Sequence, residues 1–167
     1  MVQQRCRQWM TRAILVSALV PARGVGAVAA NEEVLRPVVL TNQQPAGSFP
    51  VAREILASKP AIVFVSITRV VNPDITPFEI WVHLSFENRK SASGEKRILV
   101  GNFSLYPPDK TGGFQLNAAD AFRTLEEAGK EQGEVRLEVE MRSLHDMKRG
   151  TPIEVTISPP VWRKGKR

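Results

Sequence analysis

Three side chains that could bind copper lie close together in the C-terminal quarter of the chain. Met141, His145 and Met147 occur within the sequence MRSLHDM. Thioether sulfur suits Cu(I), so these residues allow a copper carrier. Met141 also falls on the apolar side of an alternating pattern, which favours a core methionine beside two loop residues. Both interpretations stay open, and copper is expected as a ligand only under the first.

Patterns typical of other metal sites and of enzymes are missing from the sequence. The chain has two histidines, His83 and His145, and one cysteine, Cys6, which are too few for a tetrahedral zinc or blue-copper site. The sequence contains no G-x-S-x-G elbow, and the glycine pair at 112–113 has no P-loop lysine after it. We therefore expect no enzymatic activity and no cofactor.

Three aromatic residues are candidates for binding a partner. Trp81 lies on the polar side of a predicted strand, where His83 is expected beside it as a surface residue. Tyr106 and Phe114 flank a predicted loop that contains two prolines and two glycines. Aromatic side chains outside a core often anchor a protein partner, although covering a neighbouring loop or helix is commoner.

The body of the chain consists mainly of predicted strands. Residues 78–86 and 134–142 alternate apolar and polar side chains, which is typical of half-buried strands. Residues 61–70 are almost continuously apolar and predict a strand covered on both faces. Residues 97–106 and 151–157 predict two further strands, and Gly101 suggests a bulge or a close backbone approach in the first of them.

One good helix is predicted over NAADAFRTLEEAG, with Asn117 as its N-cap and Gly129 after its end. The pattern as a whole predicts a mainly β chain folded as an antiparallel β-sandwich, Ig-like or an open barrel, with one short helix. Residues 31–59 are expected to form an N-terminal arm that lends an edge strand and at most a turn or two of helix. The sandwich is expected over 60–162, and a basic tail over 163–167.

The first thirty residues resemble a secretory signal peptide. Basic residues without any acid precede the short apolar run AILVSALV, and the small residues GVGAVAA follow it. The apolar run is too short to cross a bilayer, which takes about 20 residues. We expect cleavage after Ala29 or Ala30 and a periplasmic or secreted protein that has no membrane association afterwards.

Removal of this segment changes the charge. The chain has 23 basic and 17 acidic residues, a net charge of +6, and four of the arginines and no acid lie within residues 1–30. The mature chain keeps 19 basic against 17 acidic residues, or +2. Four of those cations belong to residues 163–167, which leaves 15 against 17, or −2, for the rest. Nucleic-acid binding needs clustered cations on a folded face, so no nucleic-acid partner is expected.

The strand and helix pattern from about Ile62 to Trp162 resembles the β-sandwich domain that follows the copper domain in polyphenol oxidases and tyrosinases. The similar segments are FEIWVHLSF, RILVGNFSLYPPDKTGGF, NAADAFRTL, EVRLEVEMRS and TPIEVTISPPVW. In that family the domain packs over the dicopper site and can shield it with a side chain from a loop. The resemblance points to the loop around Tyr106–Phe114 as the place of such a contact.

The histidine-rich copper domain of that family is missing from this sequence. The resemblance therefore implies a non-catalytic module that is accessory to, or shields, a separate tyrosinase-like copper oxidase. A periplasmic copper carrier that uses Met141, His145 and Met147 is one alternative. An exported sandwich that binds another protein or a small ligand is a second.

Overall fold

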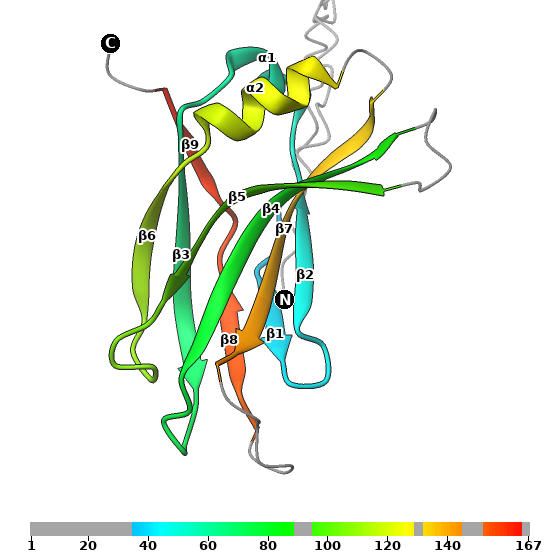
Figure 1. Cartoon of the computed structure of the whole chain (residues 1–167). Helices are drawn as coiled ribbons and strands as arrows, with labels where there is room; N and C mark the ends of the chain where they lie inside the picture. The colour runs from blue at the N-terminus through cyan, green and yellow to red at the C-terminus, as the bar shows by residue number, and fades with distance from the viewer. Residues whose placement is uncertain (1–34, 89–94, 129–131, 145–151, 165–167) are drawn as a thin grey trace, which may run out of the picture. The chain divides into compact units, whose positions relative to one another are not determined.

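The computed structural model describes residues 35–88, 95–128, 132–144 and 152–164. Within these residues, nine strands form two antiparallel sheets that face each other (Figure 1). The first sheet has the order β1 (Val38–Thr41), β8 (Glu154–Ile157), β3 (Ile62–Val71) and β6 (Gly112–Asn117), and β9 (Val161–Arg163) also pairs with β3. The second sheet has the order β2 (Ala46–Pro50), β7 (Gln132–Ser143), β4 (Phe78–Asn88) and β5 (Glu95–Ser104). The predicted mainly β sandwich is confirmed.

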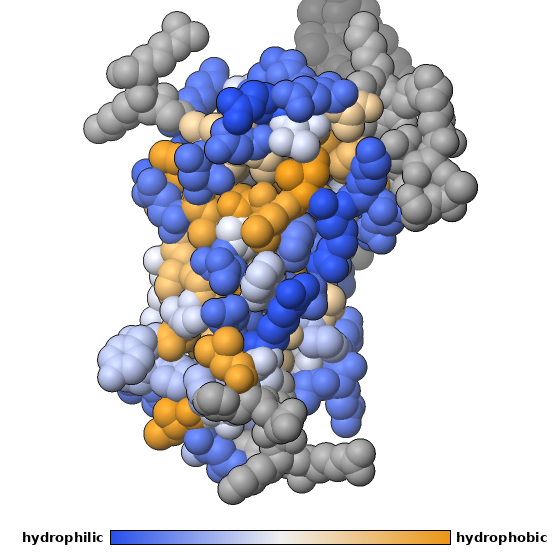
Figure 2. Space-filling view, viewed as in Figure 1, coloured by the Kyte–Doolittle hydropathy of each residue, from blue (hydrophilic) through white to orange (hydrophobic). Residues whose placement is uncertain are grey.

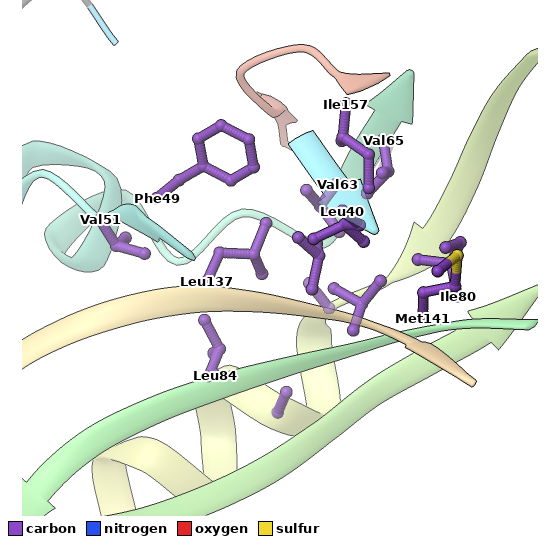
Figure 3. Close-up of a cluster of buried hydrophobic side chains, with 14 of the residues drawn as sticks. Leu40, Phe49, Val51, Val63, Val65, Ile80, Leu84, Leu137, Met141 and Ile157 are labelled. Carbon is purple, nitrogen blue, oxygen red and sulfur yellow. The ribbon is translucent and has the colours of Figure 1, made fainter. Parts of the chain in front are cut away.

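The core lies between the two sheets and is built from every second residue of the strands. The inward-facing apolar residues of β4 and β7 are all buried, as their alternation predicts: Phe78, Ile80, Val82, Leu84 and Phe86 in β4, and Val135, Leu137, Val139 and Met141 in β7. Figure 3 shows Leu84 and Leu137 near side chains from the N-terminal strands. A fully buried side chain of this kind contributes roughly 1.5–3 kcal/mol.

The N-terminal arm is part of the sandwich. It supplies two edge strands, β1 in the first sheet and β2 in the second, where one was expected. Leu40 and Phe49 point from these strands into the core and are 0% and 2% exposed. Pro37, Pro45 and Pro50 border the two strands, and proline is tolerated at a sheet edge because no ladder hydrogen bond is lost there.

The first sheet corrects two expectations. Strand β3 is not covered on both faces, because only its inward residues Val63, Val65 and Ile67 are fully buried. On the outer face, Phe64 is half-buried and the Arg163 guanidinium lies 4.6 Å from the centre of its ring. Strand β6 begins with Gly112 and Gly113, which were expected as the end of a loop, and these two glycines pair with β3 in register.

Two helices lie at one end of the sheets (Figure 1), where one helix was expected. Helix α2 (Ala119–Glu127) is the predicted one, but its N-cap is Ala118 and not Asn117, which ends β6. Oδ1 of Asn117 still accepts a hydrogen bond from the backbone N–H of Ala119, at 3.0 Å. Its buried Phe122 meets the ring of Trp162 edge to face at 5.5 Å. The short α1 (Arg53–Ser58) is the helical turn expected in the arm.

The bulge expected near Gly101 is present in β5. Val82 pairs with Gly101, and the next residue, His83, pairs with Leu99, so Val100 is the extra residue. A Cβ atom at Gly101 would lie 3.2 Å from Cδ2 of Leu116, so the backbone also lies close to a side chain of β6 in the other sheet. In the described part of the chain, no helix is long and apolar enough to cross a membrane.

Gly47 gives a direct test of the packing between β1 and β2. A Cβ atom at Gly47 would lie 2.2 Å from Cγ1 of Val38, so in Gly47→Ala either the Val38 side chain or one of the two strands must shift. We expect a loss of about 1–3 kcal/mol in the free energy of unfolding, measured by urea denaturation.

Gly113→Ala is the matched control, because its new Cβ would meet Ser66 Oγ at an ordinary 3.8 Å. Equal losses for the two variants would contradict the close approach at Gly47.

Candidate functional site

The β3–β4 turn and the β5–β6 loop are held together by one buried amide. Asn72 is 5% exposed, and its Nδ2 donates to the carbonyl oxygens of Thr76 at 2.9 Å and Pro108 at 3.1 Å. Its Oδ1 accepts from the backbone N–H of Thr76 at 3.0 Å. The two loops are therefore fixed relative to each other by hydrogen bonds that are shielded from water.

Exposed apolar side chains lie at this end of the sandwich. Tyr106 is 98% exposed, although Leu105 beside it is buried. Ile75 and Leu144 are 56% and 47% exposed, and the backbone N–H of Leu144 donates to the oxygen of Pro77 in the β3–β4 turn. Figure 2 shows hydrophobic residues at the lower end, where Figure 1 places these loops. We call Ile75, Tyr106 and Leu144 the loop end.

Phe114, the second aromatic residue predicted to bind a partner, does not belong to the loop end. It lies in β6, half-buried, and its ring stacks on that of Phe103 with 3.9 Å between the centroids. Phe103 belongs to β5 of the other sheet. This stack bridges the edges of the two sheets, so the ring serves packing.

Trp81, the third predicted residue, lies half-buried on the outer face of the second sheet. Its ring stacks with that of His83, with a centroid distance of 6.2 Å, and the Arg142 guanidinium lies 4.3 Å from its centre. Its Nε1 donates to Oε2 of Glu79 at 2.9 Å. Trp81 is therefore enclosed by its neighbours and is less open to a partner than Tyr106.

Arg97 extends this arrangement across three strands. From β5, its Nη2 donates to Oε2 of Glu140 at 2.8 Å, and its Nε lies 2.9 Å from Oε2 of Glu138. Nη2 also lies 3.3 Å from Nδ1 of His83. Glu140 in turn accepts two hydrogen bonds from Arg142, at 2.9 and 3.2 Å. We call this set the outer network: Glu79, Trp81, His83, Arg97, Glu138, Glu140 and Arg142.

The outer network explains why His83 is not the surface residue that the sequence predicted. His83 is 8% exposed, because β4 is flanked on both sides and long side chains from β5 and β7 cover it. In Figure 2 a hydrophilic band crosses this face along β4 and β7. Sequence alternation places His83 on the polar face, but its burial depends on which strands pair, which the alternation does not specify.

Two groups of the network have shifted pKa values. Hydrogen bonds from Arg142 and Arg97, against a smaller opposing effect of burial, lower the pKa of Glu140 from 4.5 to about 2. Burial, followed by the positive charge of Arg97, lowers the pKa of His83 from 6.5. Glu140 is therefore ionised and His83 neutral near pH 7.

The copper cluster is only partly within the structure. Met141 is 3% exposed and faces the core beside Ile80 (Figure 3), so the interpretation as a core methionine fits this residue. His145 and Met147 lie outside the described residues. Among the residues that are described, no group of three or more His, Cys, Asp or Glu side chains is placed to hold a metal ion.

Comparison with known proteins identifies no relative of this chain. The chain matches no protein-family model and no curated protein sequence. A functional proposal therefore depends on the loop end, the outer network and the sequence resemblance.

The pKa of Glu140 predicts how acid affects stability. Because the pKa of Glu140 in the folded state lies below its ordinary value, the ionised carboxylate stabilises the fold. This stabilisation is complete above pH 4.5 and is lost as the pH falls toward 2. We expect the free energy of unfolding, measured by urea denaturation across this range, to fall less steeply in Glu140→Gln than in the unchanged protein.

Glu134→Gln is the control on the same strand, because its side chain is 59% exposed and its ion pair with Arg136 contributes little. The assignment to Glu140 fails if the two variants have the same pH dependence.

Proposed function

We propose that this chain is an exported, non-catalytic β-sandwich module that binds a protein partner through its loop end. The observation that carries the proposal is Tyr106, whose side chain is 98% exposed beside the buried Leu105. Aromatic residues that are held in place and exposed are frequent anchors of protein interfaces, because burying them releases much apolar surface at little entropic cost.

The surroundings of Tyr106 support a prearranged binding surface. The amide of Asn72 fixes the β3–β4 turn against Pro108, two residues after Tyr106. The other exposed apolar side chains of the loop end are Ile75 and Leu144. Ile75 belongs to the same turn, and the backbone N–H of Leu144 is hydrogen-bonded to it. A surface that is ordered before binding loses less conformational entropy when the complex forms.

The position of the helices also favours the loop end. Helix α2 buries Ala121, Phe122 and Leu125 against the opposite end of the sheets. The exposed faces of the second sheet carry paired charges, such as Arg97 with Glu140. Burying such ion pairs under a partner has a desolvation cost, whereas covering Tyr106 removes apolar surface from water.

The resemblance to the domain that follows the copper site in tyrosinases suggests the class of partner. In that family a side chain from a loop shields the dicopper site, and the resemblance points to the loop from Tyr106 to Phe114. Tyr106 suits this role better, because Phe114 is already stacked on Phe103. We therefore propose a separate tyrosinase-like copper oxidase as the partner, shielded by Tyr106.

Inhibition of such an oxidase tests the proposal. The purified protein is titrated into a tyrosinase that lacks its own C-terminal domain, and the oxidation of a diphenol is followed. We expect inhibition that is saturable, and Tyr106→Ala should weaken it by about 30-fold, the loss typical of a hot-spot residue. Tyr106→Phe separates the contribution of the ring from that of the hydroxyl group.

Lys110→Ala is the matched control, since Lys110 lies in the same loop with 67% of its side chain exposed. The absence of inhibition, or equal inhibition by the Tyr106→Ala variant, overturns the proposal. Circular dichroism of each variant shows whether the sandwich is intact.

A further inference from the structure

Strand β5 is attached to the rest of the second sheet by one neighbour only. It lies at the edge of the sheet and pairs with β4. The pairing is interrupted opposite His83, where the register shifts between Gly101 and Leu99. A bulge disrupts the ladder locally, so the part of β5 before it depends more on side-chain contacts.

Arg97 supplies such a contact in that part of β5. It reaches over β4 to the carboxylates of Glu138 and Glu140 on β7, at 2.9 and 2.8 Å. The same guanidinium lies 3.3 Å from Nδ1 of His83. A guanidinium only donates hydrogen bonds, so Nδ1 must be the acceptor and His83 must be neutral in this arrangement.

We propose that the contact between Arg97 and His83 is an acid-sensitive latch: protonation of His83 releases Arg97 from the outer network and loosens the edge strand β5. This inference goes beyond the proposed function and does not depend on any partner. It adds a response to pH that acts on the strand leading into the loop that carries Tyr106.

Charged groups surround the His83 ring on both sides of β4. Arg97 faces it from β5, and Glu138, which pairs with His83 in register, faces it from β7. Three further charged residues lie on the same outer face: Arg136, Glu140 and Arg142 on β7. Glu79 lies two positions before Trp81 on β4 itself, and β2 places the uncharged Ser48 opposite Glu138.

The carboxylate of Glu138 can bind either Arg97 or protonated His83. In the described part of the chain, its Oε2 is buried and accepts no well-aligned hydrogen bond, although Nε of Arg97 lies 2.9 Å away. Protonated His83 has lost the acceptor that Arg97 uses and has gained a donor at Nδ1, on a residue that pairs in register with Glu138. The imidazolium therefore competes with Arg97 for this carboxylate and repels its guanidinium.

The direction of the response follows from the pKa of His83. Burial and the charge of Arg97 lower this pKa in the closed arrangement, whereas in an opened one it returns toward 6.5. The latch is therefore closed above about pH 6.5. As the pH falls below that value, the free energy needed to open the latch decreases. The decrease stops when the pH reaches the pKa that His83 has in the closed arrangement.

Amide hydrogen exchange of the full-length protein tests the latch. We expect the protection factors of residues 95–99 to fall by about tenfold per pH unit below pH 6.5, while those of β3 stay constant. In the variant His83→Gln, which cannot take up a proton, the protection factors of 95–99 should not change over the same range.

His145→Gln is the matched control, because His145 is the other histidine of the chain and should leave the response intact. A fall in His83→Gln equal to that of the unchanged protein overturns the latch, as does constant protection in the unchanged protein. If His83→Gln fails to fold, NMR titration of the two histidines decides the matter. The amide exchange rates of residues 95–99 must then change with the titration of His83. Exchange rates that change with the titration of His145, or with that of neither histidine, overturn the latch.

Discussion

The burial of alternate side chains from β4 and β7 is the interaction on which the rest of the structure depends. These two strands form the centre of the second sheet, and their inward residues, such as Val82 and Val139, are completely removed from water. Because side chains alternate along a strand, the same burial directs Trp81 and His83 outward. The core and the outer network are therefore two sides of one pairing, and a register slip of one residue would lose both.

Local patterns predicted the parts of the fold that depend on neighbouring residues in the chain. The alternation of β4 and β7, the helix α2 and the bulge at Gly101 are all visible in the sequence, although α2 begins two residues after the predicted N-cap Asn117. Strands β2, β6 and β9 were not predicted, because β2 and β6 contain glycine or proline and the three-residue β9 directly follows two prolines. Pairing with long central strands stabilises them, and such tertiary contacts override local propensity.

The candidate site was predictable to a smaller extent. Tyr106 is exposed in a loop, as its proline-rich surroundings indicate, whereas Phe114 and Trp81 are partly enclosed. The difference arises from contacts with Phe103 and Arg142, each of which belongs to a different strand from the residue it covers. Polar neighbours on a strand reveal that a side chain points outward, but only the pairing partners determine how much of it stays in water.

Strands β8 and β9 both pair with β3, each along a different part of it. Strand β9 pairs with the beginning of β3, at Ile62–Phe64, and β8 pairs with its second half. The chain thus leaves β9 beside the helices, while the loop end follows the other end of β3, about 30 Å away for a ten-residue strand. A partner bound at Tyr106 would therefore lie at the end of the sandwich opposite to β9 and the helices.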